Sequence, residues 1–131
     1  MKIFDCFIFF DEKDLAELRI NILKDHVDYF VICEAKQNHR GLPKKLNFPL
    51  EKFNQIKEKI IYITLDSFPK FNSTWKRQDY QRNYLLNGLS KADSNDLILF
   101  SDADEIPNPI ILKNLYKECY DKVGIFVQKF F

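Results

Sequence analysis

Four short apolar runs recur along the chain, and more polar, helix-like segments separate them. The runs cover residues 3–10, 29–35, 60–65 and 97–100. Strands that are apolar along their whole length are buried on both faces, which is typical of a parallel sheet covered by helices on both sides. The pattern therefore predicts an α/β domain with a mostly parallel, Rossmann-like sheet and right-handed crossovers.

The segments between these runs predict the covering helices. A helix is expected over residues 14–24, where apolar and polar positions recur at helical spacing. Others are expected from Pro49 to residue 57, from an N-cap at Ser73 to about residue 91, and over residues 110–119, with a fifth strand over 123–131. In the first helix the expected apolar stripe is Leu15, Leu18, Ile22 and Leu23, beside the polar residues Glu17, Arg19 and Lys24.

Composition narrows the class of protein. A chain of 131 residues with 46% hydrophobic residues fits a single packed domain. Its net charge of +1, with Lys and Arg scattered among Asp and Glu, does not support nucleic-acid binding. No apolar stretch is long enough to span a bilayer, and the first run lacks the features of a signal peptide.

Three widely spaced cysteines, Cys6, Cys33 and Cys119, lack the spacing of a zinc site. An odd number of cysteines favours free thiols, two of them inside apolar runs where they serve as small core residues. We expect a reducing compartment, and therefore a cytoplasmic location.

Acidic residues follow the strands, where open parallel sheets bind their ligands. We expect them to gather on one rim of the sheet. No glycine-rich phosphate loop follows any strand, so a bound phosphate would depend on a metal. The acids in question are Asp11, Glu12, Glu34, Asp66, Asp102, Asp104 and Glu105.

Asp102 and Asp104 are the candidate metal ligands. Two aspartates separated by one residue can point the same way from an extended segment and address one divalent cation. Oxygen ligands favour Mg²⁺ or Mn²⁺, with coordination positions left for phosphate oxygens. The alternative is that acids after a strand are simply turn formers and helix caps, a role that also suits Glu105.

Glu34 and Arg82 are candidate ligand contacts elsewhere on the rim. A carboxylate after the second strand can accept hydrogen bonds from ribose hydroxyls, although a cap or a surface salt bridge explains it equally well. Arg82 shares a predicted helix with Trp75 and Gln78 and can bind a diphosphate with two nitrogens, although a solvated helix face explains the same residues. His39, in a polar loop, could serve a sugar or a phosphate.

Five segments in order, residues 5–12, 28–35, 39–44, 81–83 and 101–107, resemble glycosyltransferase family 17. The similarity covers essentially the whole chain. The resemblance implies a GT-A type fold in which Asp102 and Asp104 hold Mn²⁺ or Mg²⁺ on the diphosphate of a UDP-sugar. It also implies that Glu34 and the segment from Phe10 through Asp11 to Glu12 line the nucleoside pocket.

The resemblance further implies transfer of a sugar, N-acetylglucosamine, from the UDP-sugar to a glycan acceptor. Because GT-A domains are usually longer, we expect residues 1–131 to be one nucleotide-sugar-binding domain that forms the N-terminal part of a truncated GT-A unit. The catalytic base would then lie outside it. Two other functions stay open: a metal-dependent nucleotidyl- or phosphotransferase that uses the same carboxylates, and a binding fragment without turnover.

Overall fold

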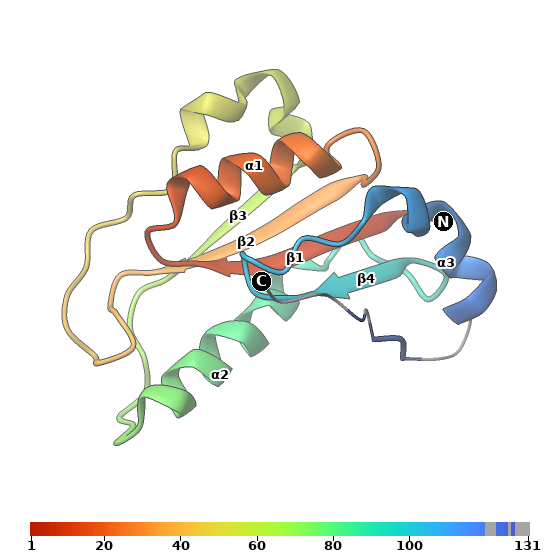
Figure 1. The fold of residues 1–131 in the computed structure, drawn as a ribbon. Coiled ribbons are helices and arrows are strands. Elements are labelled where there is room, and N and C mark those ends of the chain that lie inside the picture. The colour runs from red at the N-terminus through yellow and green to blue at the C-terminus, as the bar shows by residue number, and fades with distance from the viewer. Residues whose placement is uncertain (120–122, 126, 128–131) are drawn as a thin grey trace.

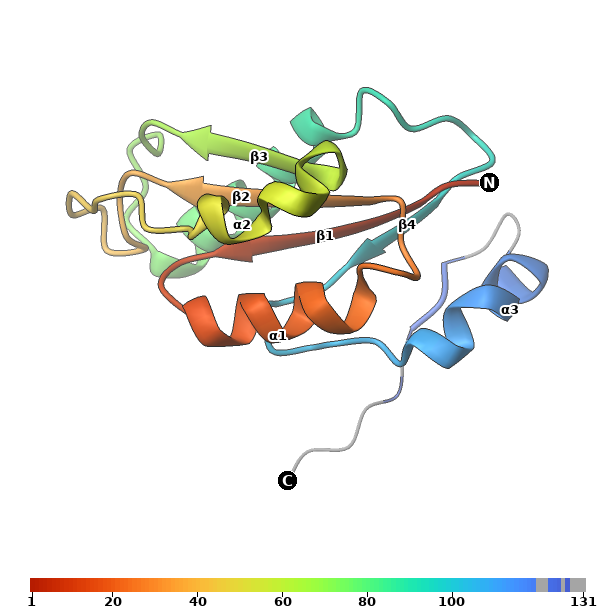
Figure 2. The same ribbon diagram turned by 90° about the horizontal axis from the view of Figure 1, so that it is seen from above.

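Four parallel strands form one sheet in a computed structural model that describes residues 1–119, 123–125 and 127. The strands lie in the order β3-β2-β1-β4, with β1 at an inner position (Figure 1). Their arrowheads point toward the same end of the sheet (Figure 2). The predicted parallel α/β fold is therefore confirmed. The bounds are β1 (Ile3–Phe9), β2 (Tyr29–Ala35), β3 (Ile60–Leu65) and β4 (Leu97–Phe100).

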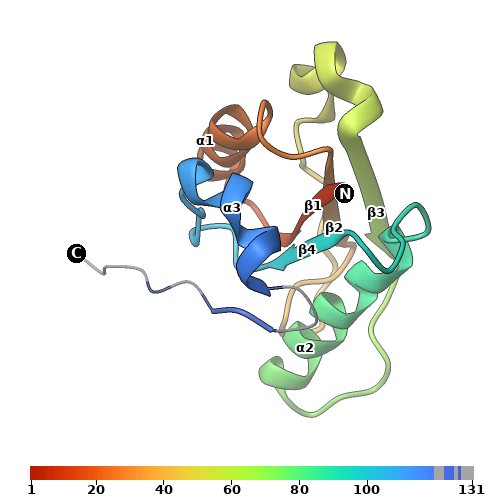
Figure 3. The same cartoon turned by 90° about the vertical axis from the view of Figure 1, so that its right-hand side faces the viewer.

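Helices cover both faces of this sheet (Figure 3). On one face lie α1 (Lys13–Leu23) and the 3-10 helix η1 (Leu50–Lys59), and on the other lie α2 (Thr74–Tyr84) and the short η2 (Leu85–Gly88). The last described helix is α3 (Pro109–Cys119), which adds Leu112 to the first layer. In the part of the chain that the structure describes, no helix has the length and apolar character needed to cross a bilayer.

Alternation along the strands produces two separate apolar layers. Phe7 and Phe9 of β1 pack toward α1, whereas Phe4 and Cys6 pack toward α2 and η2. Because side chains alternate with period two, Asp5 must share the α1 face with Phe7. An acid is thus buried in the middle of the sheet, and it needs a partner.

The buried stripe of α1 differs from the prediction. Leu18 and Ile22, predicted to be apolar core positions, are 51% and 37% exposed. Leu23 is buried as predicted and Leu15 packs against the core, and the other buried positions of the stripe are Ala16, Arg19 and Ile20. The four buried positions follow the i, i+3, i+4, i+7 spacing of one helix face, so placing Arg19 on the polar side was wrong. Arg19 was assigned to the polar side because it is charged, although it is buried in the core.

The predicted helix from Ser73 to residue 91 also ends early. It becomes a 3-10 turn at Leu85 and stops at Gly88. A Cβ atom at Gly88 would lie 2.3 Å from Cγ1 of Val31, so the backbone approaches β2 more closely there than any side chain allows. Glycine is therefore required at this contact with β2.

A fifth strand was predicted over residues 123–131. Residues 123–125 and 127 form no strand, and the other residues of that segment lie outside the described residues.

Cys6 and Cys33 are free and buried, as predicted. Burial, reinforced by the neighbouring carboxylates of Asp5 and Glu34 respectively, raises the pKa of each thiol to about 12. Both are therefore protonated core residues rather than reactive groups.

Candidate functional site

A fully buried ion pair joins β1 to α1. Arg19 donates from Nε and Nη2 to the two carboxylate oxygens of Asp5, at 2.8 and 2.7 Å. Its guanidinium also lies over the ring of Phe7, 4.8 Å from the ring centroid. Arg19 is thus the partner that the buried Asp5 requires, and Asp5 neutralises the buried arginine.

The remaining donors of Arg19 hold the turn that follows β4. Nη1 donates to the backbone oxygens of Asp102 at 2.7 Å and of Glu105 at 3.1 Å, and Nη2 donates to Oγ of Ser101 at 2.5 Å. The Ser101 hydroxyl in turn donates to the Glu105 carbonyl at 3.0 Å. The backbone that carries the Asp-x-Asp sequence is therefore fixed from inside the protein.

Glu105 closes the same turn with its side chain. Its Oε2 accepts the backbone N–H of Asp102 at 2.8 Å. The capping role considered for the acids after this strand therefore belongs to Glu105. The side chains of Asp102 and Asp104 are half-buried and exposed, respectively, and neither accepts a backbone N–H from the residues that the structure describes.

Both aspartates line a cleft of about 320 Å³ at the carboxyl end of β1, between α1 and α2. Acids and neutral polar groups face it together with apolar side chains. Of the residues proposed from the sequence, Phe10, Glu12, His39, Asp102 and Asp104 are therefore brought together. The lining is Ile8, Phe9, Phe10, Glu12, Leu15, His39, Gln78, Gln81, Asp102, Ala103 and Asp104.

Arg82 reaches the rim of this cleft from α2. Its Nη2 donates to Oδ1 of Asp102 at 2.8 Å and to Oδ2 at 3.1 Å. The two side chains are 38% and 40% exposed, so the pair is accessible to solvent. Arg82 also lies 3.4 Å from Asp79 on its own helix. Asp102 is thus both a candidate ligand of a metal ion and the partner of Arg82.

Asp11 and Glu12 lie in the turn between β1 and α1. Oε1 of Glu12 accepts the backbone N–H groups of Phe10 at 2.8 Å and of Asp11 at 3.1 Å, and so shapes the turn. Asp11 is exposed and does not line the cleft. Of the two acids, Glu12 is therefore the one placed to meet a ligand there.

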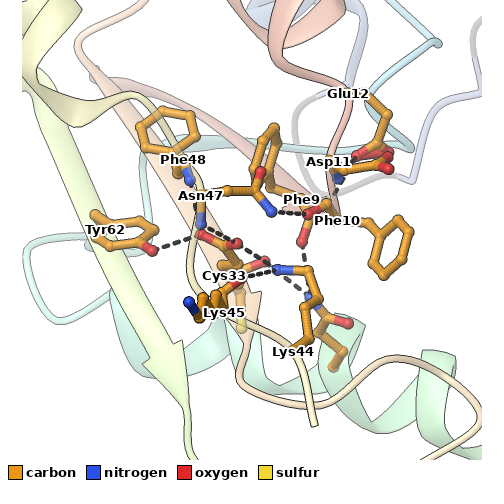
Figure 4. A network of polar contacts seen from close by, with 12 residues as sticks. Phe9, Phe10, Asp11, Glu12, Cys33, Lys44, Lys45, Asn47, Phe48 and Tyr62 are labelled. Atoms are coloured by element: carbon orange, nitrogen blue, oxygen red, sulfur yellow. Dashed lines mark hydrogen bonds and ion pairs between the residues drawn. The ribbon is translucent and has the colours of Figure 1, made fainter. Parts of the chain in front are cut away.

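Glu34 lies at the same end of the sheet, but it is fully buried and does not line the cleft. Its carboxylate accepts the backbone N–H groups of Asn47 at 2.8 Å and Phe48 at 3.0 Å and pairs with the ammonium of Lys44. These three partners are labelled in Figure 4. The carboxylate also accepts the hydroxyl of Tyr62 at 2.6 Å. Glu34 thereby ties β3 and a polar loop to β2.

This network reaches the cleft through Phe10. The side-chain amide of Asn47 donates to the Phe10 carbonyl at 3.1 Å, and the Lys44 ammonium lies 5.5 Å from the Phe10 ring centroid. Burial, the hydrogen bond to Glu34 and the charge of Glu34 together hold the pKa of the Tyr62 phenol well above its usual range. Tyr62 is therefore a permanent hydrogen-bond donor to Glu34.

The donor set at the cleft fits a hard cation that shares its coordination with a ligand. Asp102 and Asp104 supply only carboxylate oxygens, the type that Mg²⁺ and Mn²⁺ prefer. No group of three or more His, Cys, Asp or Glu side chains forms a ready-made metal cage within the described ranges. Phosphate oxygens of a ligand would have to complete the coordination.

Comparison with known proteins identifies the family of the chain. The model of glycosyltransferase family 17 matches residues 1–128. The chain belongs to this family. Relatives described as beta-1,4-mannosyl-glycoprotein 4-beta-N-acetylglucosaminyltransferase share 36% identity in Homo sapiens and Rattus norvegicus and 35% in Mus musculus, each over 106 residues. No solved structure matches.

The match covers 73% of this family-17 chain and 20% of each of those relatives. The chain thus spans about one fifth of the length of the curated relatives it matches. The family resemblance predicted from the five ordered segments is confirmed.

We predict that replacing Asp5 with Asn destabilises the family-17 domain strongly. The substitution leaves the charge of Arg19 buried without a counter-charge, which costs about 3–5 kcal/mol of unfolding free energy. The exposed ion pair between Lys36 and Asp66 provides the control, because Asp66→Asn should cost less than about 1 kcal/mol. Urea denaturation of the two variants measures the difference, and equal losses would contradict the role given to the buried pair.

We also predict that Glu34→Gln costs more than Tyr62→Phe. The glutamine amide presents N–H groups to partners that are themselves donors and leaves Lys44 unpaired, at a cost of about 3 kcal/mol. Loss of the Tyr62 hydroxyl removes one hydrogen bond to a charged acceptor, about 1.5 kcal/mol. If thermal or chemical unfolding ranked the two variants in the opposite order, Glu34 would not be the residue that holds β3 and the polar loop to β2.

Proposed function

We propose that this chain forms the donor-binding part of a glycosyltransferase and binds a UDP-sugar through Mn²⁺ or Mg²⁺. The observation that carries the proposal is the position of Asp102 and Asp104 on an open cleft at the carboxyl end of the sheet, in a chain of family 17. Open α/β sheets bind nucleotides at this edge. The absence of a glycine-rich phosphate loop from the sequence also favours metal-assisted binding of the diphosphate.

Asp102 and Asp104 would hold the cation. When bound, the cation supplies positive charge that offsets the charge on the departing nucleoside diphosphate. Arg82 is placed to assist, because a guanidinium binds phosphate oxygens with two nitrogens at once. In the structure it is paired with Asp102, so ligand binding would exchange one anionic partner of Arg82 for another.

The nucleoside would lie beside the turn that contains Phe10, Asp11 and Glu12. The Phe10 ring is 41% exposed, so it offers an apolar face near the edge of the cleft. Glu34 would act on this part of the site indirectly, since its carboxylate orders the loop whose Asn47 binds the Phe10 carbonyl. Loss of Glu34 would then loosen the nucleoside side of the cleft.

The names of the relatives support N-acetylglucosamine as the transferred sugar and a glycan as its acceptor. An acceptor hydroxyl would attack the anomeric carbon of the sugar while the bond to the diphosphate breaks. This step also needs a base to take the proton of that hydroxyl. We assign that role to no residue of this chain.

The test is a calorimetric titration of UDP into the chain with and without Mn²⁺. Because Asp102 and Asp104 repel the diphosphate when no cation is present, Mn²⁺ should raise the UDP affinity by roughly 10-fold or more, equivalent to about 1.4 kcal/mol. Replacing both aspartates with Asn should abolish the dependence on Mn²⁺ while the domain stays folded, since two like charges are removed from one site.

The control carries the same change of charge outside the cleft. Glu51→Gln together with Glu58→Gln, both on the exposed side of η1, should leave the Mn²⁺ dependence intact. If the UDP affinity were the same with and without Mn²⁺ and were unchanged by the Asp102/Asp104 double substitution, the two aspartates would not hold a metal. If GDP or CMP bound more tightly than UDP, the donor would carry that nucleotide instead of UDP.

A further inference from the structure

Neutral polar side chains line the cleft beside the carboxylates, and the amide of Gln81 organises them. Gln81 is 3% exposed, and its Nε2 donates to the carbonyl of Cys33 at 2.9 Å and to that of Phe9 at 3.4 Å. Carbonyl oxygens can only accept, so these two contacts fix which end of the amide is the NH₂ group. The Gln81 oxygen therefore faces the ring of His39, with Oε1 2.7 Å from Nε2.

This contact determines the tautomer of His39. An amide oxygen cannot donate, so the proton of the hydrogen bond must be on Nε2 of the imidazole. In the neutral ring the other nitrogen, Nδ1, then carries the lone pair and acts as an acceptor. Within the described part of the chain, Nδ1 of His39 has no hydrogen-bond partner and is not among the buried unpaired atoms.

The loop that carries His39 is held in place on several sides. Nη1 of Arg77 donates to the His39 carbonyl at 2.9 Å, and the ring of Phe68 meets the imidazole edge-on with centroids 6.1 Å apart. The turn beyond is closed by Oδ1 of Asn38 and by Gly41, whose positive φ of 82° suits glycine. A half-buried imidazole in the cleft lining is thus oriented before any ligand arrives.

We infer that His39 binds the donor, with Nδ1 accepting a hydrogen bond from an O–H or N–H group of the nucleotide sugar. The inference rests on the proposed function. It also excludes the diphosphate as the partner, because its oxygens are acceptors and an acceptor nitrogen cannot serve them. Ribose and sugar hydroxyls and the N–H groups of the base and of an acetamide can donate. His39 and the acids of the same cleft would then recognise different parts of one donor.

Two substitutions separate a contact with the ligand from a contact with Gln81. His39→Asn keeps a polar atom near the position of Nδ1 but loses the reach to Gln81. His39→Gln keeps the reach to Gln81 but places no acceptor at the Nδ1 position. Affinities for UDP and UDP-N-acetylglucosamine in the presence of Mn²⁺ are measured by calorimetry for both variants. The chain's other histidine, His26, lies outside the cleft lining, and His26→Gln is the control.

We predict that His39→Asn stays within about 2-fold of the parent, whereas His39→Gln binds about 3- to 10-fold more weakly, the loss of one neutral hydrogen bond. Weakening of both ligands by His39→Gln would assign the contact to the nucleoside, which the two ligands share. Weakening of UDP-N-acetylglucosamine alone would assign it to the sugar.

Three results would overturn the inference: the opposite order of the two variants, equal losses in both, or parental affinity in both. Each would mean that His39 serves only the packing around Gln81 or contributes nothing to binding. If Mn²⁺-dependent UDP binding persisted beside such a result, the proposed function would stand without the His39 contact. If the parent chain bound no UDP at all, both proposals would fall together.

Discussion

The architecture of the cleft depends on one guanidinium. Arg19 binds a carboxylate on β1 and, at the same time, backbone and hydroxyl oxygens in the turn after β4. A lysine ammonium has three donors on one atom and could not span these positions, whereas the planar fork of arginine can. Because the interaction is buried, it is also protected from screening by salt. The Asp-x-Asp turn is therefore shaped by the core before a ligand is present.

Four acids inside the sheet or at its carboxyl edge fall into two groups with different uses. Asp5 and Glu34 are fully buried, and each satisfies donors of the protein itself. Asp102 and Asp104 keep their carboxylates at the cleft, because Arg19 and Glu105 hold the turn without them. The buried acids thus make the surrounding backbone rigid, and the proposed cation would meet Asp104 together with an Asp102 that is paired with Arg82. A site prepared in this way loses little conformational freedom when it binds.

Much of the fold could be predicted from the sequence, because apolar runs of strand length between helical segments leave few arrangements other than a parallel sheet. The cleft positions of Asp102 and Asp104 followed from the same rule. The role of Arg19 could not be predicted in this way, because a charged side chain on a helix is usually exposed to solvent. Its spacing with Ala16, Ile20 and Leu23, together with the acid inside the first strand, was the available signal. The burial of Glu34 could not be foreseen, since its partners come from segments distant in sequence.

The position at which Mn²⁺ binds decides whether this cleft is the donor site. In the NMR spectrum of the ¹⁵N-labelled chain with UDP, substoichiometric Mn²⁺ broadens the amide signals of residues close to the metal. If Asp102 and Asp104 hold the metal, the signals of residues 102–104 and 10–12 should broaden first and those of η1 should stay sharp. Asp102→Asn together with Asp104→Asn should remove the effect. Broadening centred on another part of the surface, or unchanged by the double substitution, would contradict the assignment of this cleft as the metal-assisted donor site.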